Sequence, residues 1–206
     1  MQVPLEVIGL SKVYNKKEAV KDISFKVNKN EIIGILGPNG CGKTTTIGMI
    51  LGLLKPSKGE VLINGIEIET KRVDLLDCLN FISPYVELPK KLTVRQNLEV
   101  YGRLYDVQNL KKKINTLSEK LRLNEIIDKI TGELSSGQKN RVSLAKSIIN
   151  DPLVLLLDEP TASLDPETGD FVRSFLENYQ KEMKASILLA SHNMSEVERL
   201  CSSVLM

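Results

Sequence analysis

The amino-acid sequence predicts a mainly parallel α/β core with an N-terminal antiparallel β portion and an inserted helical subdomain. Three observations predict this fold class. The first sixty or so residues are rich in strand patterns, helical periodicity follows from about residue 92, and strand patterns return near residue 153. Strands that alternate with helices are typical of parallel sheets, and a contiguous helical block within them indicates an insertion.

The strand-rich part contains four candidate segments. Apolar residues alternate or cluster at 4–10 and at 23–27, and the run EIIGIL at 31–36 has the composition of a buried strand. The segment GEVLINGIEI at 59–68 predicts a hairpin, because its Asn64-Gly65 pair is a strong turn dipeptide.

The later elements follow in order along the chain. A helix is predicted from Lys43 to about Leu53, before Pro56, which cannot continue a helix. Apolar residues at three- and four-residue spacing predict further helices between about 92 and 129. Strands are then predicted at 153–157 and at 186–190, with a helix between them.

Composition and charge favour one packed domain without a nucleic-acid partner. The chain has 206 residues, of which 42% are hydrophobic and 26% charged, enough to bury a core. A formal charge of +2, with both signs mixed along the chain, does not favour binding to nucleic acid or to an anionic membrane. The basic run at 111–113 has no aromatic neighbours, so it indicates a solvated helix face.

The cysteines and the apolar runs bear on the location of the protein. Cys41, Cys78 and Cys201 lie far apart, and their odd number excludes a complete disulfide framework and favours a reducing cytosol. The N-terminal stretch lacks the pattern of a signal peptide, and no apolar run approaches the roughly 20 residues that span a bilayer. At a membrane, another chain would do the crossing.

The strongest motif matches GxxxxGK[ST] and lies between a predicted strand and a predicted helix. Glycines let backbone N–H groups turn inward around phosphate oxygens, and a helix N-terminus adds partial positive charge. Lys43 can reach the β- and γ-phosphates, and Thr44 offers a hydroxyl to Mg²⁺. The motif predicts a P-loop NTPase core. Its predicted nucleotide-binding residues are Gly37, Pro38, Asn39, Gly40, Cys41, Gly42, Lys43, Thr44 and Thr45.

A second motif, LVLLLDEP at 153–160, places two acids after a buried strand. The carboxyl edge of a parallel sheet is where ligands of α/β proteins bind. Asp158 would hold Mg²⁺, directly or through water, and Glu159 would orient and polarise the attacking water. Two such acids alone would more often form a surface turn, but the phosphate loop favours the catalytic interpretation.

A third motif, Leu134-Ser-Ser-Gly-Gln138, opens a predicted helix and resembles the LSGGQ signature of ABC ATPases, with Ser136 at a position that is usually glycine. An ordinary helix cap would by itself explain Ser135. The order of this motif, the DEP motif, Ser163-Leu-Asp165 and His192 extends the resemblance to ABC nucleotide-binding domains over almost the whole chain.

The resemblance implies roles for further residues and for a second cassette, either another copy or a paralogue. Two cassettes would pair head to tail around two ATP molecules, each site combining the phosphate loop of one chain with Ser135, Gly137 and Gln138 of the other. Asp165 would lie across the dimer interface, and His192, the only histidine, would contact the γ-phosphate. Tyr14 resembles the aromatic residue that stacks on adenine, although packing would explain it about equally well.

The family pattern also predicts the domain organisation. The chain would form a single ABC ATPase domain. Its RecA-like core with the antiparallel β portion would comprise 1–80 and 152–206, and its helical subdomain with the signature about 90–150.

Two departures from the family pattern stand out. Pro84 occupies the place of the usual Gln in the loop between core and subdomain, so that acceptor is missing or is supplied by Ser83 or Glu87. The family usually continues past the equivalent of Met206 with another strand and a terminal segment, so we expect a truncated or a minimal cassette.

The expected function is ATP binding and hydrolysis as the cytoplasmic motor subunit of an ABC membrane transporter. Such a subunit is peripheral on the inner face of the cell membrane and is held there by a transmembrane permease. The segment LTVRQNLEVYGRLYDV at 92–107 resembles single-cassette exporters of the drug, sodium and polysaccharide kind. The alternative is a soluble ABC ATPase of translation or DNA repair. Those relatives usually carry two cassettes or a long coiled-coil insertion, and this chain has neither.

Overall fold

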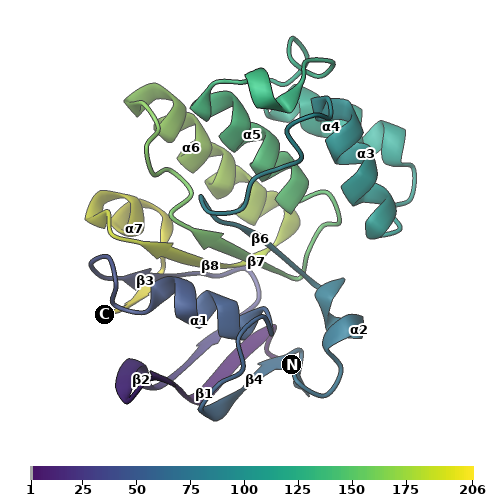
Figure 1. The fold of residues 1–206 in the computed structure, drawn as a ribbon. Coiled ribbons are helices and arrows are strands. Elements are labelled where there is room, and N and C mark those ends of the chain that lie inside the picture. Colours follow the sequence, from purple (N-terminus) through teal and green to yellow (C-terminus); the bar gives the residue numbers. More distant parts are fainter. Residues whose placement is uncertain (1) are drawn as a thin grey trace.

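The structure is a computed structural model that describes residues 2–206. It contains a parallel and an antiparallel sheet, which confirms the predicted α/β fold class (Figure 1). The parallel sheet has the spatial order β6 (Leu79–Ile82), β7 (Val154–Asp158), β8 (Ser186–Ser191), β3 (Ile32–Leu36) and β9 (Ser203–Leu205). The antiparallel sheet has the order β2 (Lys17–Val27), β1 (Leu5–Tyr14), β4 (Lys58–Ile63) and β5 (Ile66–Glu67).

The parallel sheet is covered on both faces, as parallel sheets usually are. Successive side chains of a strand point to opposite faces, so β7 contributes to two separate cores. Leu155 and Leu157 pack into the core beneath the helical layer, whereas Val154 and Leu156 pack into the core shared with the antiparallel sheet. This explains why the sequence of β7 is continuously apolar rather than alternating.

Helix α1 (Lys43–Ile50) lies between the two sheets (Figure 1). Its buried Ile47, Met49 and Ile50 belong to the same core as β1 and β4. The helix ends earlier than the predicted Leu53, because Gly52 takes a left-handed conformation (φ 64°). The N–H groups of Leu53 and Leu54 then donate to the Gly48 carbonyl, so the helix ends before Pro56 is reached.

The opposite face of the parallel sheet carries the helical layer (Figure 1). It comprises α3 (Val94–Leu104), α4 (Leu110–Lys120), α5 (Ser136–Ser147) and α6 (Pro166–Met183). The predicted helical pattern up to Lys129 is wrong beyond Lys120. Arg122 adopts a left-handed conformation (φ 52°) that ends the helix, and the chain continues in turns.

Several elements were not predicted from the sequence. The short helix α2 (Arg72–Leu76), a 3₁₀ turn (Thr131–Glu133), α7 (Met194–Leu200) and the strands β6 and β9 belong to this group. The first hairpin is also longer than predicted, because β2 begins at Lys17 rather than near residue 23. The Asn64-Gly65 turn is present, with both residues at positive φ. Within residues 2–206, no helix combines the length and apolarity needed to cross a bilayer.

Candidate active site

Three loops meet at the carboxyl edge of the parallel sheet. One follows β3 and contains the glycine-rich motif, one follows β7 and begins with Glu159, and one follows β8 and contains His192. Since β7 pairs with β8 and β8 pairs with β3, all in parallel, these loops are neighbours in space. Ligands of open α/β sheets bind at such an edge.

The glycine-rich loop is packed closely against the antiparallel sheet. Gly42 caps helix α1 in a left-handed conformation (φ 102°), and its carbonyl accepts from the N–H of Thr46 at 2.8 Å. A Cβ atom on Gly42 would lie only 2.4 Å from the carbonyl oxygen of Ala19 in β2. Both the backbone angle and the contact therefore require glycine at this position.

The amine of Lys43 is held inside this loop. Its Nζ atom donates to the carbonyl oxygens of Gly37 at 2.7 Å and Pro38 at 3.2 Å. It also lies 3.3 Å from Oε1 of Glu159, an ion pair that lacks hydrogen-bond geometry. The side chain is only 5% exposed, so a buried cation faces the space enclosed by the loop.

Asp158 is the buried carboxylate at the end of β7, and it is 1% exposed. Its Oδ2 atom accepts hydrogen bonds from Thr44 Oγ1 at 2.9 Å and from Ser83 Oγ at 3.3 Å. Burial raises the pKa of Asp158 above its usual value, and the hydrogen bonds from Thr44 and Ser83 offset only part of this rise. Its Oδ1 atom is buried and has no hydrogen-bond partner among the described residues.

These oxygens fit a divalent cation. Mg²⁺ prefers hard oxygen ligands and is usually bound by one or two carboxylates together with substrate phosphates. A carboxylate oxygen without a partner, next to the hydroxyl of Thr44, provides that kind of donor set.

Glu159 has an unusual backbone conformation. Its φ of 52° is left-handed, which costs roughly 1–2 kcal/mol for a residue other than glycine. Two backbone hydrogen bonds maintain it: the Glu159 N–H donates to the Ala190 carbonyl at 2.8 Å, and the Glu159 carbonyl accepts from Ala162 at 3.1 Å. Strained residues of this kind cluster at functional sites.

The same glutamate contacts the only histidine of the chain. Its Oε2 atom lies 2.7 Å from Nδ1 of His192. Because an ionised carboxylate can only accept hydrogen bonds, Nδ1 of His192 is the donor. The His192 side chain is 53% exposed and the Glu159 side chain 13%, so the pair lies at the mouth of the site.

A cavity of about 260 Å³ joins eight of the predicted site residues. It is lined by Ala19, Asn39, Gly40, Gly42, Lys43, Thr44, Thr45, Tyr85, Asp158 and Glu159. The predicted loop residues outside this lining are Gly37, Pro38 and Cys41. Cys41 is exposed, with its Sγ atom close to Gly37.

The aromatic residue at this cavity is Tyr85, which was not predicted from the sequence. Tyr14, the predicted adenine-stacking residue, is absent from the lining. It is 43% exposed, and Lys12 Nζ lies 5.0 Å from its ring centroid. Nothing in the sequence marks Tyr85, because loop composition does not indicate which way an aromatic side chain points.

The signature residues lie at the start of α5, away from this cavity. Ser135 caps the helix, its hydroxyl accepting from the N–H of Gln138 while Oε1 of Gln138 accepts from the N–H of Ser135. Gly137 lies against Thr168 of α6, where an added Cβ would be 3.2 Å from a methyl group. Asp165 caps α6 by accepting from the N–H of Thr168 at 2.9 Å, and this bond lowers its pKa. None of these predicted residues lines the phosphate-loop cavity within one chain.

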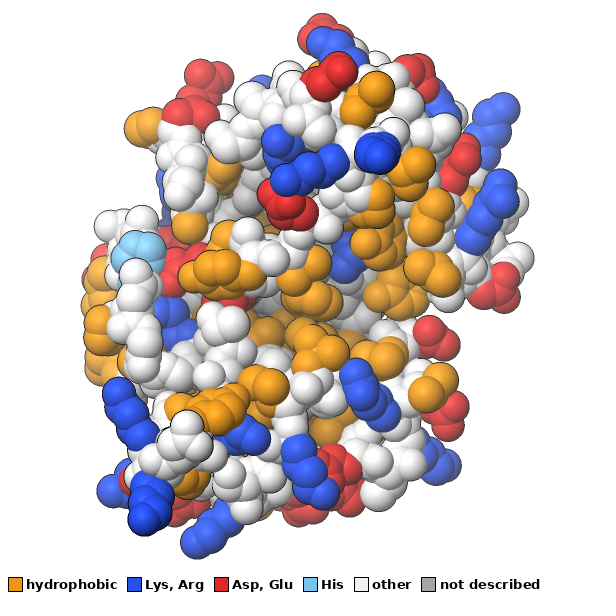
Figure 2. Space-filling view, in the orientation of Figure 1, with side chains coloured by type: hydrophobic (Ala, Val, Ile, Leu, Met, Phe, Trp, Pro, Cys, Tyr) orange, Lys and Arg blue, Asp and Glu red, His pale blue; other side chains and the backbone are white. Residues whose placement is uncertain are grey.

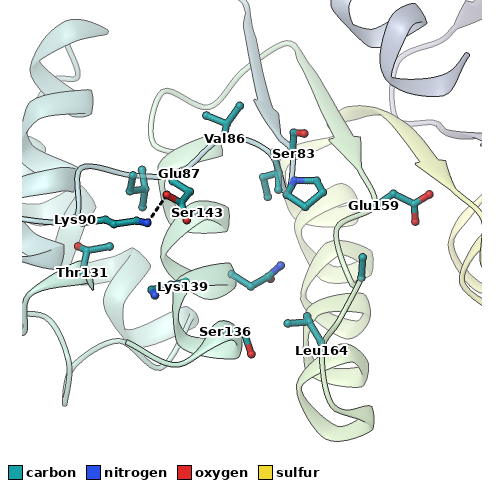
Figure 3. A pocket seen from close by; sticks show the side chains of 15 residues that line it. Ser83, Val86, Glu87, Lys90, Thr131, Ser136, Lys139, Ser143, Glu159 and Leu164 are labelled. Atoms are coloured by element: carbon teal, nitrogen blue, oxygen red, sulfur yellow. Dashed lines mark ion pairs between the residues drawn. The ribbon is translucent and has the colours of Figure 1, made fainter. Parts of the chain in front are cut away.

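The loop that contains Pro84 also contains Ser83 and Glu87, the two candidate replacements for the usual glutamine. A cavity of about 220 Å³ lies between this loop and α5 and is lined also by Glu159 (Figure 3). Ser83 lies at the side of this cavity nearer Glu159, whereas Glu87 forms an ion pair with Lys90 at 2.7 Å on the other side (Figure 3). Of the two candidates, only Ser83 hydrogen-bonds to Asp158.

Comparisons with known proteins give a consistent family. A family model described as "ABC transporter" matches residues 20–162. The chain is 35% identical to the ABC transporter ATP-binding protein NatA of Bacillus subtilis over 192 residues, which cover 92% of this chain and 78% of NatA. It is 39% identical to the Nod factor export ATP-binding protein I of Rhizobium johnstonii over 202 residues, which cover 97% of this chain but 64% of that relative.

Solved structures agree with this match. An ATP-binding subunit of an ABC transporter has a TM-score of 0.89 at 28% identity, covering 98% of this chain and 84% of that one. The cbiO1 protein of Clostridium perfringens, part of the ABC transporter complex cbiONQ, has a TM-score of 0.85 at 30% identity, covering 99% and 84%. The chain therefore belongs to the ABC transporter ATP-binding family, whose members are ATPases.

Proposed function

We propose that this chain hydrolyses MgATP as the energy-supplying subunit of a membrane exporter. The observation that carries the proposal is the convergence of a buried lysine, a partnerless carboxylate oxygen and a glutamate–histidine pair at one sheet edge. These groups belong to Lys43, Asp158, Glu159 and His192. The positive charge of the loop suits binding of a polyphosphate. The two acids beside it suit a reaction in which water attacks the terminal phosphate.

The phosphates of ATP would bind in the glycine-rich loop. The loop N–H groups, the start of α1 and the amine of Lys43 supply positive charge to phosphate oxygens. Thr44 and Asp158 would hold Mg²⁺, which neutralises charge on the phosphates when bound. Tyr14 remains the proposed adenine-stacking residue.

Glu159 would orient the attacking water and accept its proton. The left-handed backbone and the contact with His192 hold this carboxylate in one place, which suits a general base. His192, half-exposed at the mouth, would contact the γ-phosphate.

A second cassette would complete each site. The signature residues Ser135, Gly137 and Gln138 are remote from the phosphate cavity of their own chain, and Asp165 is exposed. This separation supports a head-to-tail pair in which the signature of one chain faces the ATP of the other. ATP would then stabilise the pair, and hydrolysis would release it.

A membrane permease is the proposed second partner, and the protein would be peripheral on the cytoplasmic face of the cell membrane. Hydrophobic side chains gather in a hollow on one face of the molecule (Figure 2). Exposed apolar residues in the loop before α3 and on α3 itself support a protein partner, because groups of exposed apolar side chains often mark interaction surfaces. They are Tyr85, Val86, Val100 and Leu104. The names of the relatives include a Nod factor export protein, which supports export and favours transport over a role in translation or repair.

Nucleotide binding tests the first part of the proposal. Calorimetry with ATP and Mg²⁺ should show that Lys43→Met weakens binding at least tenfold, because the buried cation at the loop is lost. Lys129→Met is the matched control, since Lys129 is an exposed lysine outside the site. Equal ATP affinity in Lys43→Met and the control would overturn the assignment of this loop.

The membrane partner is tested by a charge on α3. Leu104 is 71% exposed and Met183, at the end of α6, is 45% exposed. Leu104→Glu should abolish copurification with a multi-spanning membrane protein and leave basal hydrolysis unchanged, whereas Met183→Glu should retain both copurification and basal hydrolysis. Retained copurification in Leu104→Glu would exclude this face as the permease contact.

A further inference from the structure

Glu196 is a buried acid that the proposed reaction does not use. It lies on α7, directly after the loop that carries His192, and is 1% exposed. No basic side chain forms an ion pair with it within residues 2–206. A buried carboxylate is costly unless hydrogen bonds compensate, so its partners explain why it is tolerated.

Both partners are hydroxyls next to proposed catalytic residues. Oε1 of Glu196 accepts from Thr161 Oγ1 at 2.7 Å, and Oε2 accepts from Ser191 Oγ at 2.7 Å. Thr161 follows Glu159 by two residues, and Ser191 directly precedes His192. One carboxylate therefore connects the loop after β7, through Oε1, to the end of β8 directly before His192, through Oε2.

The carboxylate is itself fixed in place. The N–H of Glu196 donates to Asn193 Oδ1 at 3.3 Å, which caps α7, and Ser191 Oγ also accepts from the N–H of Asn193 at 3.0 Å. The carbonyl of Ser191 accepts from the N–H of Gly37 at 3.3 Å, which extends the network to the glycine-rich loop.

We propose that Glu196 is a positioning residue that sets the contact between Glu159 and His192 by holding their two loops together. It is not among the residues that line the cavity at the glycine-rich loop. Its contribution is geometric, because proton transfer and water attack depend steeply on the placement of the reacting groups. This inference rests on the proposed catalytic roles of Glu159 and His192.

The single histidine makes the proposal directly measurable. In the full chain with isotope-labelled histidine, the imidazole resonances of His192 report its contact with Glu159 without overlap. A Glu159→Ala variant provides the spectrum of the broken contact. Glu196→Ala should shift the His192 resonances towards that spectrum, whereas Glu196→Gln should retain the wild-type resonances, since an amide can accept from one hydroxyl and donate to the other.

Kinetics provide the second readout. We expect Glu196→Ala to lower kcat for ATP about tenfold or more, with KM within about threefold of the wild type, because the phosphate-binding groups remain. Glu198→Ala is the matched control, as it removes an exposed acid from the same helix and should change neither readout.

Two outcomes separate the positioning role from the proposed function. Wild-type His192 resonances in folded Glu196→Ala would overturn the positioning role. Changed resonances with unchanged kcat would support the positioning role and overturn the catalytic assignment of the pair. If circular dichroism shows that Glu196→Ala does not fold, Thr161→Val removes one hydroxyl with little change of shape. Its His192 resonances should shift in the same direction, and wild-type resonances there would equally overturn the proposal.

Discussion

The amine of Lys43 lies 3.3 Å from a carboxylate oxygen of Glu159, so the cation that we propose binds phosphate is paired with the proposed base. Phosphate binding must therefore compete with this carboxylate for the lysine. Replacement of Glu159 by glutamine removes both the competitor and the base.

Glu159→Gln should accordingly separate binding from hydrolysis. We expect ATP affinity to rise a few-fold, because Lys43 loses its acidic neighbour, and kcat to fall by roughly two orders of magnitude or more. Calorimetry and a phosphate-release assay measure the two effects, and ATP-bound dimers should accumulate in size-exclusion chromatography. Near-normal turnover in this variant would exclude Glu159 as the catalytic carboxylate.

Ser83→Ala tests which residue stands in for the missing glutamine. Loss of the hydroxyl that donates to Asp158 should weaken the Mg²⁺ dependence of ATP binding several-fold, because hydrogen bonds to charged groups are among the stronger ones. ATP affinity in EDTA should not change. Glu87→Ala should behave as wild type, since Glu87 pairs with Lys90 instead. A Mn²⁺ titration in which Glu87→Ala weakens metal-dependent ATP binding and Ser83→Ala does not would contradict this assignment.

The three cysteines should react with maleimide in a fixed order. Cys41 is exposed, whereas burial raises the pKa of the Cys78 thiol and raises that of Cys201 to about 12. Since the thiolate is the reactive form, Cys41 should be labelled first at neutral pH, and bound MgATP should protect it. Mass spectrometry identifies the modified residue. Labelling of Cys41 that leaves ATP affinity intact would contradict its position at the phosphates.

Lys146 should make stability depend on pH. It is 8% exposed, and its Nζ atom donates to Asn80 Oδ1 at 2.9 Å and lies 4.8 Å from the Phe81 ring centroid. Burial lowers its pKa from 10.5 to about 8, so between these values the unfolded chain binds more protons than the folded one. The Lys146 contribution to the free energy of unfolding should therefore rise with pH across this window, by about 3 kcal/mol in total.

Urea denaturation of the wild type and of Lys146→Met, at pH 7.5 and at pH 10, isolates this contribution. The free energy of unfolding of the wild type, minus that of Lys146→Met, should increase as the pH rises. A difference that is the same at both pH values would show that the Lys146 ammonium is not destabilised by its surroundings.

Local patterns predicted the parts of the site that lie within one continuous segment. The glycine-rich loop depends on neighbouring residues and on a strand and helix beside it, so Gly37 to Thr44 could be identified directly. Asp158 ends an apolar strand that is buried on both faces, which composition alone indicates.

Contacts between distant segments were not predictable in the same way. Glu196 forms one of its hydrogen bonds across 35 residues to Thr161, and a single sequence contains no pattern for such pairs. Tyr85 lines the cavity because of the path of its loop, and α4 ends at Lys120, before a left-handed Arg122, although its apolar spacing continues. Tertiary packing decides these features, and local preference does not.

The close approach of Gly42 to the carbonyl of Ala19 has a consequence for how this sequence can change over generations. Any side chain at position 42 would force β2 away from the start of α1. We therefore expect natural selection to remove substitutions of Gly42. The restriction is mutual, because a shift of the β2 backbone would displace the glycine-rich loop that we propose binds phosphate. We therefore expect the antiparallel sheet to change slowly around Ala19 during evolution, although it carries none of the proposed catalytic residues.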